Sequence, residues 1–155
     1  MSNQFDFKKL RKLTTIHTVV QVFFAILFIA FAFWFQQQLV AEGRPQRFYQ
    51  SIFIAIGIQL ALFLPLSRGA QWEATRDIES AVANITPEQQ KTLRNRRAIA
   101  DVLKSAVFLF FATFIWKMPR DTFFLSLALF SFLLTFLSYS QYFGMAVKRK
   151  LKELA

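Results

Sequence analysis

Four long apolar runs alternate with polar links along this chain of 155 residues. The runs cover roughly residues 14–37, 51–66, 102–118 and 123–147. A transmembrane α-helix needs about 20 mostly apolar residues, and short links make consecutive helices antiparallel neighbours. We therefore predict an all-α integral membrane protein, a four-transmembrane-helix up-down-up-down bundle that forms a single membrane domain over residues 1–155.

The only long polar segment, residues 67–104, lies between the second and third apolar runs. Thr86 is placed as an N-cap, Pro87 stands at the first helical position, and Glu88 meets the positive end of the helix dipole. No helix breaker follows before the third run ends. We therefore predict one continuous helix from Pro87 to Trp116, partly in water and partly in lipid.

The two halves of this polar segment carry opposite charge. The half before the turn holds Glu73, Asp77 and Glu79 against one Arg76, and the half after it holds Lys91, Arg94, Arg96 and Arg97 against Glu88. Trp72 and Ile78 recur at helical spacing in the first half. Because opposite charges attract, the pattern predicts a cytoplasmic helical hairpin formed by extensions of transmembrane helices two and three.

Composition excludes an ordinary soluble domain. Hydrophobic residues make up 55% of the chain, which includes 21 Phe. A soluble core of this size would leave much of that aromatic surface in contact with water. The absence of cysteine also excludes disulfides, thiolate metal sites and cysteine nucleophiles.

The net charge of +10 predicts an orientation more than it predicts a polyanionic partner. The basic residues cluster beside the apolar runs, which is typical of membrane flanks near anionic lipid headgroups and not of a nucleic-acid site. With both termini inside, fifteen Lys and Arg lie inside and four lie in the two outer turns. The positive-inside rule then predicts an N-in, C-in protein of the bacterial inner (cytoplasmic) membrane.

The second apolar run contains one polar side chain and one pair of small residues that are candidate sites. Gln59 lies near its centre, and an amide in hydrocarbon requires a partner, so we expect an interhelical hydrogen bond. A substrate or ion contact is the alternative for Gln59. Gly57 and Ala61 form a small-xxx-small pair that would let another helix approach closely.

The fourth run carries a stripe of small and polar residues at spacings of three and four. Its members are Ala128, Ser131, Thr135, Ser138 and Tyr142. This stripe predicts a helix-packing seam, with a hydroxyl-lined pathway as the alternative. Ser140 and Gly144 form a second small pair on another face, which would suit an external partner or a second copy.

Two further candidates lie at the predicted cytoplasmic side. His17 is the only histidine. Its place near the start of the first apolar run predicts an interfacial side chain that is hydrogen-bonded to its neighbours. The alternatives are a proton relay or a cofactor-binding role as an axial ligand of a haem. The basic residues that predict a partner or lipid surface are Arg94, Arg96, Arg97 and Lys104.

No nucleotide-binding loop, metalloprotease motif or dinucleotide fingerprint occurs in the sequence. No carboxylate lies deep in an apolar run, whereas proton-coupled transporters usually bury one. The leading interpretation is a non-enzymatic accessory, assembly or scaffold subunit of a larger membrane complex, bound to other membrane subunits or to itself. The alternatives are a small oligomeric transporter or channel, and a protein that binds quinone, pigment or haem on its Phe-rich helices.

Overall fold

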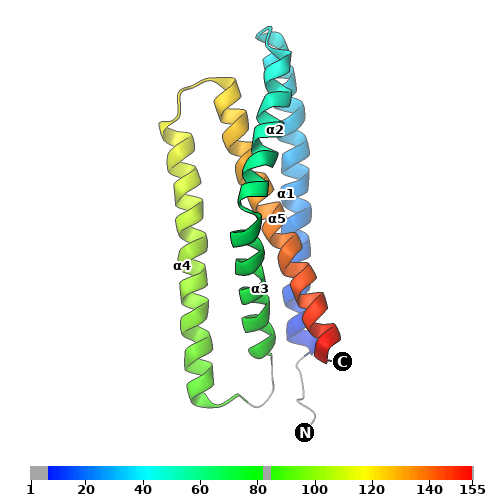
Figure 1. The fold of residues 1–155 in the computed structure, drawn as a ribbon, viewed down its shortest axis with the longest axis vertical. Coiled ribbons are helices and arrows are strands. Elements are labelled where there is room, and N and C mark those ends of the chain that lie inside the picture. Colours follow the sequence, from blue (N-terminus) through cyan, green and yellow to red (C-terminus); the bar gives the residue numbers. More distant parts are fainter. Residues whose placement is uncertain (1–6, 82–84, 155) are drawn as a thin grey trace.

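The computed structural model describes residues 7–81 and 85–154 and contains five α-helices in them. The helices are α1 (Phe7–Ala41), α2 (Pro45–Ala61), α3 (Phe63–Glu79), α4 (Pro87–Lys117) and α5 (Thr122–Leu154). Figure 1 shows them as long rods, with the start of α1, the end of α3, the start of α4 and the end of α5 at one end of the molecule. The prediction of an all-α fold is confirmed, while Asn84, the first residue of the predicted turn between the two arms of the hairpin, lies outside the described residues.

Three helices are long and apolar enough to cross a membrane, within Thr14–Ala41, Pro87–Lys117 and Thr122–Glu153. The pair α2 and α3 passes the same test only together, and it bends by 58°. Counting this pair as one broken span gives up to four. These lengths and compositions fit the predicted integral membrane protein.

A proline explains the bend between α2 and α3. The carbonyl of Ala61 would accept a hydrogen bond from residue 65 in an unbroken helix, but Pro65 has no N–H, and its ring clashes with that carbonyl. The helix therefore breaks at Leu62, and α3 begins at Phe63 with the proline in its first turn. The predicted end of the second helix near residue 66 is wrong: α2 ends earlier, at Ala61, and the chain is helical again in α3. Pro65 does not end α3 because a proline is tolerated in the first turn of a helix.

Local signals set the other helix ends. α1 ends at Ala41, later than predicted. Two residues further on, Gly43 takes a positive φ of 71°. The N–H of Arg44 bonds to the Leu39 carbonyl at 2.8 Å, so the turn closes as a Schellman motif. The predicted N-cap at Thr86 is confirmed: its hydroxyl accepts from the N–H of Gln89, whose side chain bonds back in a capping box.

The helix α5 is the centre of the molecule, and α1, α2 and α3 all pack against it. One cluster joins α1, α2 and α5 around the fully buried Phe35, Leu39 and Phe130. A second cluster joins α3 to α5 through residues that include Ala74 and Phe143. Because α5 continues to Leu154, it covers the apolar side of α3, so α3 does not stand free of the bundle as the hairpin prediction implied.

The helix α4 is bound to the rest of the chain far more loosely than the other helices. Within its 31 residues only Ala100 is buried. The exposed hydrophobic side chains include Phe108, Phe110 and Phe114, and Trp116 is 85% exposed. Figure 1 shows α4 standing at the side of the other four helices.

Candidate functional site

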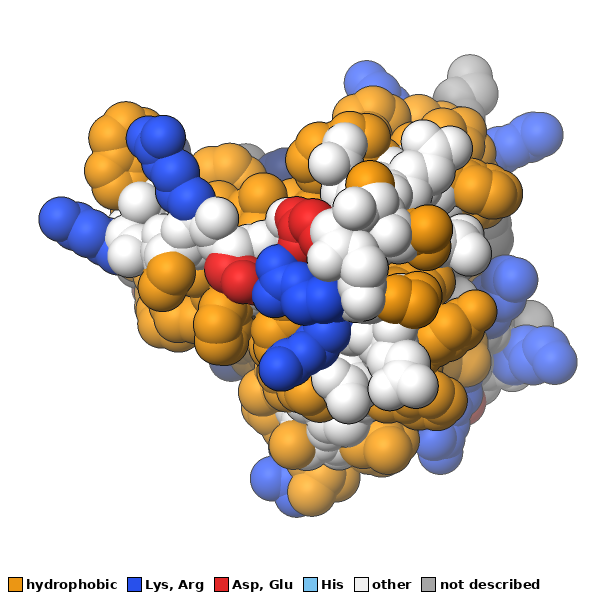
Figure 2. Space-filling model, turned by 90° about the horizontal axis from the view of Figure 1, so that it is seen from above, with side chains coloured by type: hydrophobic (Ala, Val, Ile, Leu, Met, Phe, Trp, Pro, Cys, Tyr) orange, Lys and Arg blue, Asp and Glu red, His pale blue; other side chains and the backbone are white. Residues whose placement is uncertain are grey.

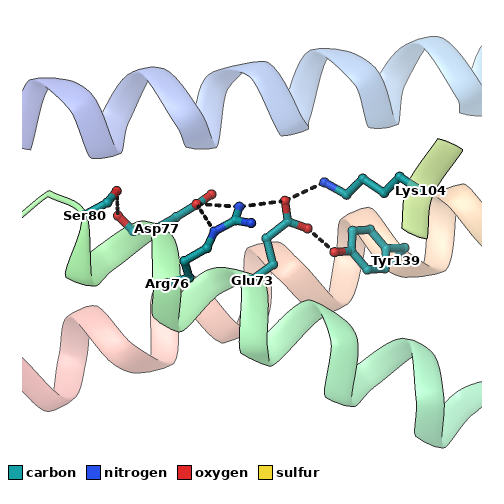
Figure 3. A network of polar contacts seen from close by, with 6 residues as sticks. All are labelled: Glu73, Arg76, Asp77, Ser80, Lys104 and Tyr139. Carbon is teal, nitrogen blue, oxygen red and sulfur yellow. Dashed lines mark hydrogen bonds and ion pairs between the residues drawn. The ribbon is translucent and has the colours of Figure 1, made fainter. Parts of the chain in front are cut away.

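A network of charged side chains joins α3, α4 and α5, and Glu73 of α3 is its centre (Figure 3). One carboxylate oxygen, Oε1, accepts from Nζ of Lys104 at 2.5 Å and from Nη2 of Arg76 at 3.2 Å. The other, Oε2, accepts from the hydroxyl of Tyr139 on α5. The Glu73 side chain is only 5% exposed, so three donors replace the water that its charge requires.

Arg76 is the second buried charge of this network. Its Nε and Nη2 atoms donate to Oδ1 of Asp77 at 3.1 and 2.8 Å, and its guanidinium lies 5.9 Å from the ring centroid of Trp72. Ser80 donates to the backbone carbonyl of Asp77 at 2.8 Å. Atom Nη1 of Arg76 is buried without a hydrogen-bond partner among the described residues. Two carboxylates thus balance two cations, and this balance lets the group be buried at the α3–α5 contact.

The network is also a principal link between α4 and the bundle. Lys104 reaches across from α4 to Glu73, and its Nζ lies 5.6 Å from the ring centroid of Tyr139. A second, exposed pair joins Arg96 to Glu79 at 3.8 Å. Opposite charges therefore connect the two arms of the predicted hairpin, but the packing partner of α3 is α5.

An apolar cavity of about 520 Å³ lies beside this network, between α1, α3, α4 and α5. Its walls include Val20, Leu66, Trp72, Val107 and Phe136. The polar or charged residues that line it are His17, Lys104, Thr135, Tyr139 and Ser140. This combination, an apolar volume with a few polar groups at its rim, is typical of a site for a small hydrophobic or amphiphilic molecule.

His17 lies on the wall of this cavity that α1 provides. Its imidazole stacks on the ring of Phe143, with centroids 3.8 Å apart and planes at 22°. Among the residues that the structure describes, no group of three or more His, Cys, Asp or Glu could hold a metal ion. The groups at the cavity that could bind a polar part of a ligand include His17 and Lys104.

Gln59 of α2 faces α5. Its Nε2 atom donates to the hydroxyl of Thr135 at 2.7 Å and to the backbone carbonyl of Ser131 at 3.2 Å. Thr135 in turn donates to the same carbonyl at 2.7 Å. Ser131 and Thr135 are buried, while Ser138 is half-buried. Gln59 and the stripe on α5 thus lie together at the α2–α5 contact.

The two small-residue pairs lie in different surroundings. Gly57 and Ala61 are exposed, and apart from the neighbouring backbone of α2 no atom of the described residues lies within 4 Å of where a Cβ on Gly57 would be. The contact of α2 with the bundle instead uses its other side, where Ser51 and Ala55 are fully buried. The other pair lies over α1: Ser140 is buried, and it shares a shallow pocket with Gly144 and His17.

The basic residues Arg94, Arg96 and Arg97 are all exposed on α4.

A second polar cluster closes the opposite end of the molecule. Arg44, in the α1–α2 turn, bonds to Glu42 and, at 3.1 Å, to Asp121 before α5. Thr122 donates to Glu42, and Asp121 accepts from the N–H of Phe123 at 2.9 Å as a helix cap. Figure 2 looks down on this end and shows acidic side chains on both sides of a basic one. These contacts connect two turns that lie about eighty residues apart in sequence.

The hydrogen bonds of this outer cluster change the acidity of its members. The Thr122 hydroxyl, with Arg44, lowers the pKa of Glu42. The hydrogen bond from Arg44 lowers the pKa of Asp121, and the two carboxylates raise the pKa of Arg44. Each charge is thus stabilised by its partners.

Sequence reasoning missed the buried position of Glu73 and Arg76, and it missed Tyr139 entirely. It placed Trp72 on the apolar side of the first arm, but Trp72 is 40% exposed. The available signal was the pair of small residues Ala70 and Ala74, both fully buried, which mark the side where α3 approaches α5.

Comparisons with known proteins do not assign this chain to a family. No protein-family model, no curated protein and no solved structure matches the chain.

Proposed function

We propose that this chain is a non-enzymatic accessory, assembly or scaffold subunit of a larger membrane complex, and that α4 is the helix that binds its partner. The observation that carries the proposal is the packing of α4, in which one residue of 31 is buried. Transmembrane helices associate through close van der Waals packing and interhelical hydrogen bonds. The other helices of this chain obtain such packing from α5, whereas α4 has most of its surface left for another protein.

The chemistry of the exposed side of α4 supports a protein partner. Phe110 and Phe114 are each about half or more exposed, and Trp116 lies beyond them. Large aromatic side chains are enriched at protein interfaces, where they provide contact area at low cost in side-chain entropy. The exposed Arg94, Arg96 and Arg97 extend this surface into the polar half of α4.

The proposal includes a membrane topology. The pair α2 and α3 forms one broken span, so the chain crosses the bacterial inner membrane four times in up-down-up-down order, with both termini and the start of α4 in the cytoplasm. The distribution of Lys and Arg supports this orientation. A reporter fused after Ala155 that is active only on the outer side of the membrane would exclude it.

Site-specific photo-crosslinking in intact membranes tests the role of α4. A photo-reactive p-benzoylphenylalanine replaces Phe110, which is 64% exposed on α4, or Ile26, which is 61% exposed on α1, as the matched control. We expect the Phe110 position to yield one defined adduct with another membrane protein, identified by mass spectrometry, and the Ile26 position to yield none. Equal adducts at both positions, or adducts with lipid alone, would refute the proposal, and an adduct with a second copy would replace the accessory subunit by a homo-oligomer.

A further inference from the structure

The cavity between α1, α3, α4 and α5 has the size of a ligand site and is open in a membrane-spanning part of the chain. Its volume of about 520 Å³ lies within the range of roughly 300–1,000 Å³ found for small-molecule sites. Its walls are almost entirely apolar, and they come from four helices. A cavity with such walls excludes water, so its natural occupant is a hydrocarbon chain.

One charged residue, Lys104, lines this cavity among the residues that the structure describes. Its side chain is 39% exposed, whereas that of its partner Glu73 is 5% exposed and does not line the cavity. The carboxylate already accepts from three donors. An ammonium has three N–H donors, and Lys104 uses one of them for Glu73, so donors remain for an anion at the mouth of the cavity.

We propose that this cavity binds an acyl chain of an anionic phospholipid, with the headgroup phosphate held by Lys104. The chain lies among Val20, Leu66 and Phe136, and the phosphate lies where α4 leaves the apolar part of the bundle. Lys104 attracts a headgroup of net negative charge, whereas in a zwitterionic lipid the headgroup cation offsets the charge of the phosphate, so the site prefers anionic over zwitterionic lipids. This binding site is separate from the exposed side of α4 that the proposed function uses.

Trp72 lines the cavity and therefore reports its occupant. A protein with Trp34→Phe and Trp116→Phe keeps Trp72 alone, and a protein with Trp72→Phe and Trp116→Phe keeps Trp34, which is 46% exposed on α1. Each is reconstituted into phosphatidylcholine vesicles with a small, equal fraction of phosphatidylglycerol or phosphatidylcholine brominated on its acyl chain, which quenches indole fluorescence on contact. We expect brominated phosphatidylglycerol to quench Trp72 about fivefold more effectively than brominated phosphatidylcholine. Trp34 should be quenched equally by the two lipids.

Two variants in the Trp72-only protein separate the cavity from its charge. Val107→Phe fills the cavity from α4 and should reduce quenching by both lipids, while Leu109→Phe, at a position 62% exposed to the outside, should not. Lys104→Gln should reduce quenching by phosphatidylglycerol to the level of phosphatidylcholine. Circular dichroism of each variant verifies that its helices are intact.

Three results would overturn the proposal. Equal quenching of Trp72 by the two lipids would mean ordinary contact with surrounding lipid. Unchanged quenching in Val107→Phe would mean that the chain lies outside the cavity. Absence of quenching at Trp72, together with a co-purified quinone or pigment found by mass spectrometry, would assign the cavity to that molecule instead.

Discussion

The substitution Glu73→Gln tests whether the buried network stabilises the association of α4 with the bundle. Glutamine keeps the size of the side chain and one carbonyl oxygen as an acceptor for Tyr139. It removes the negative charge that pairs with Lys104 at 2.5 Å and with Arg76 at 3.2 Å. The perturbation is therefore electrostatic and not a loss of packing volume.

The structure limits how much this charge contributes. Breaking a fully buried ion pair costs about 3–5 kcal/mol because it leaves the other charge uncompensated. Here Arg76 keeps Asp77 at 2.8 Å, and the Lys104 side chain is 39% exposed, so it can reach headgroups instead. Both relieve part of the penalty, and we expect a loss of about 2–3 kcal/mol in the free energy of unfolding.

Glu79→Gln is the matched control, since Glu79 lies on the same helix and pairs with Arg96 at 3.8 Å between two half-exposed side chains. Exposed pairs contribute about 0–1 kcal/mol. Reversible unfolding by titration with dodecyl sulfate in mixed micelles, followed by circular dichroism, measures both variants. A Glu73→Gln protein within about 0.5 kcal/mol of the wild type, or equal to Glu79→Gln, would refute the reasoning that the burial of Glu73 makes its charge structurally important.

Three further predictions address other parts of the molecule. Asp121 has a lowered pKa, so its contribution to stability is present above the unfolded pKa of about 4 and is lost as the pH falls through the lower folded pKa. In thermal unfolding scans, Asp121→Asn should therefore reduce the loss of stability that acid pH causes. An unchanged dependence of stability on pH would contradict this. Gln59→Leu should lower the free energy of unfolding by only about 0.5 kcal/mol in the same dodecyl sulfate titration. Interhelical hydrogen bonds average ~0.6 kcal/mol, and the substitution also removes the buried, unpaired Oε1. A loss above about 2 kcal/mol would mean that Gln59 contributes more than an ordinary interhelical hydrogen bond. Thr86→Ala removes the capping box of α4 and should destabilise its first turn by about 1 kcal/mol. Amide hydrogen exchange should then become faster in this turn and not in α5. Thr86→Ser keeps the hydroxyl and should preserve the exchange rates.

The sequence by itself determined the features that depend on neighbours along the chain. Three of the four apolar runs specified helices long enough to span a membrane, since that requirement concerns the composition of about 20 consecutive residues. The start of α4 followed from Thr86 and Pro87, because a capping hydroxyl bonds to a backbone N–H three residues away. Continuity of α4 to Lys117 followed from the absence of a later helix breaker.

Only the tertiary structure decided which sides of these helices meet. The break at Leu62 depended on Pro65 lying in the first turn of a new helix, which sequence position alone did not distinguish from a helix end. Glu73 is buried because α5 supplies Tyr139 and α4 supplies Lys104 at the same point, and these partners lie 66 and 31 residues away in sequence. A charged residue can be buried only where such donors converge, and no local pattern records that convergence.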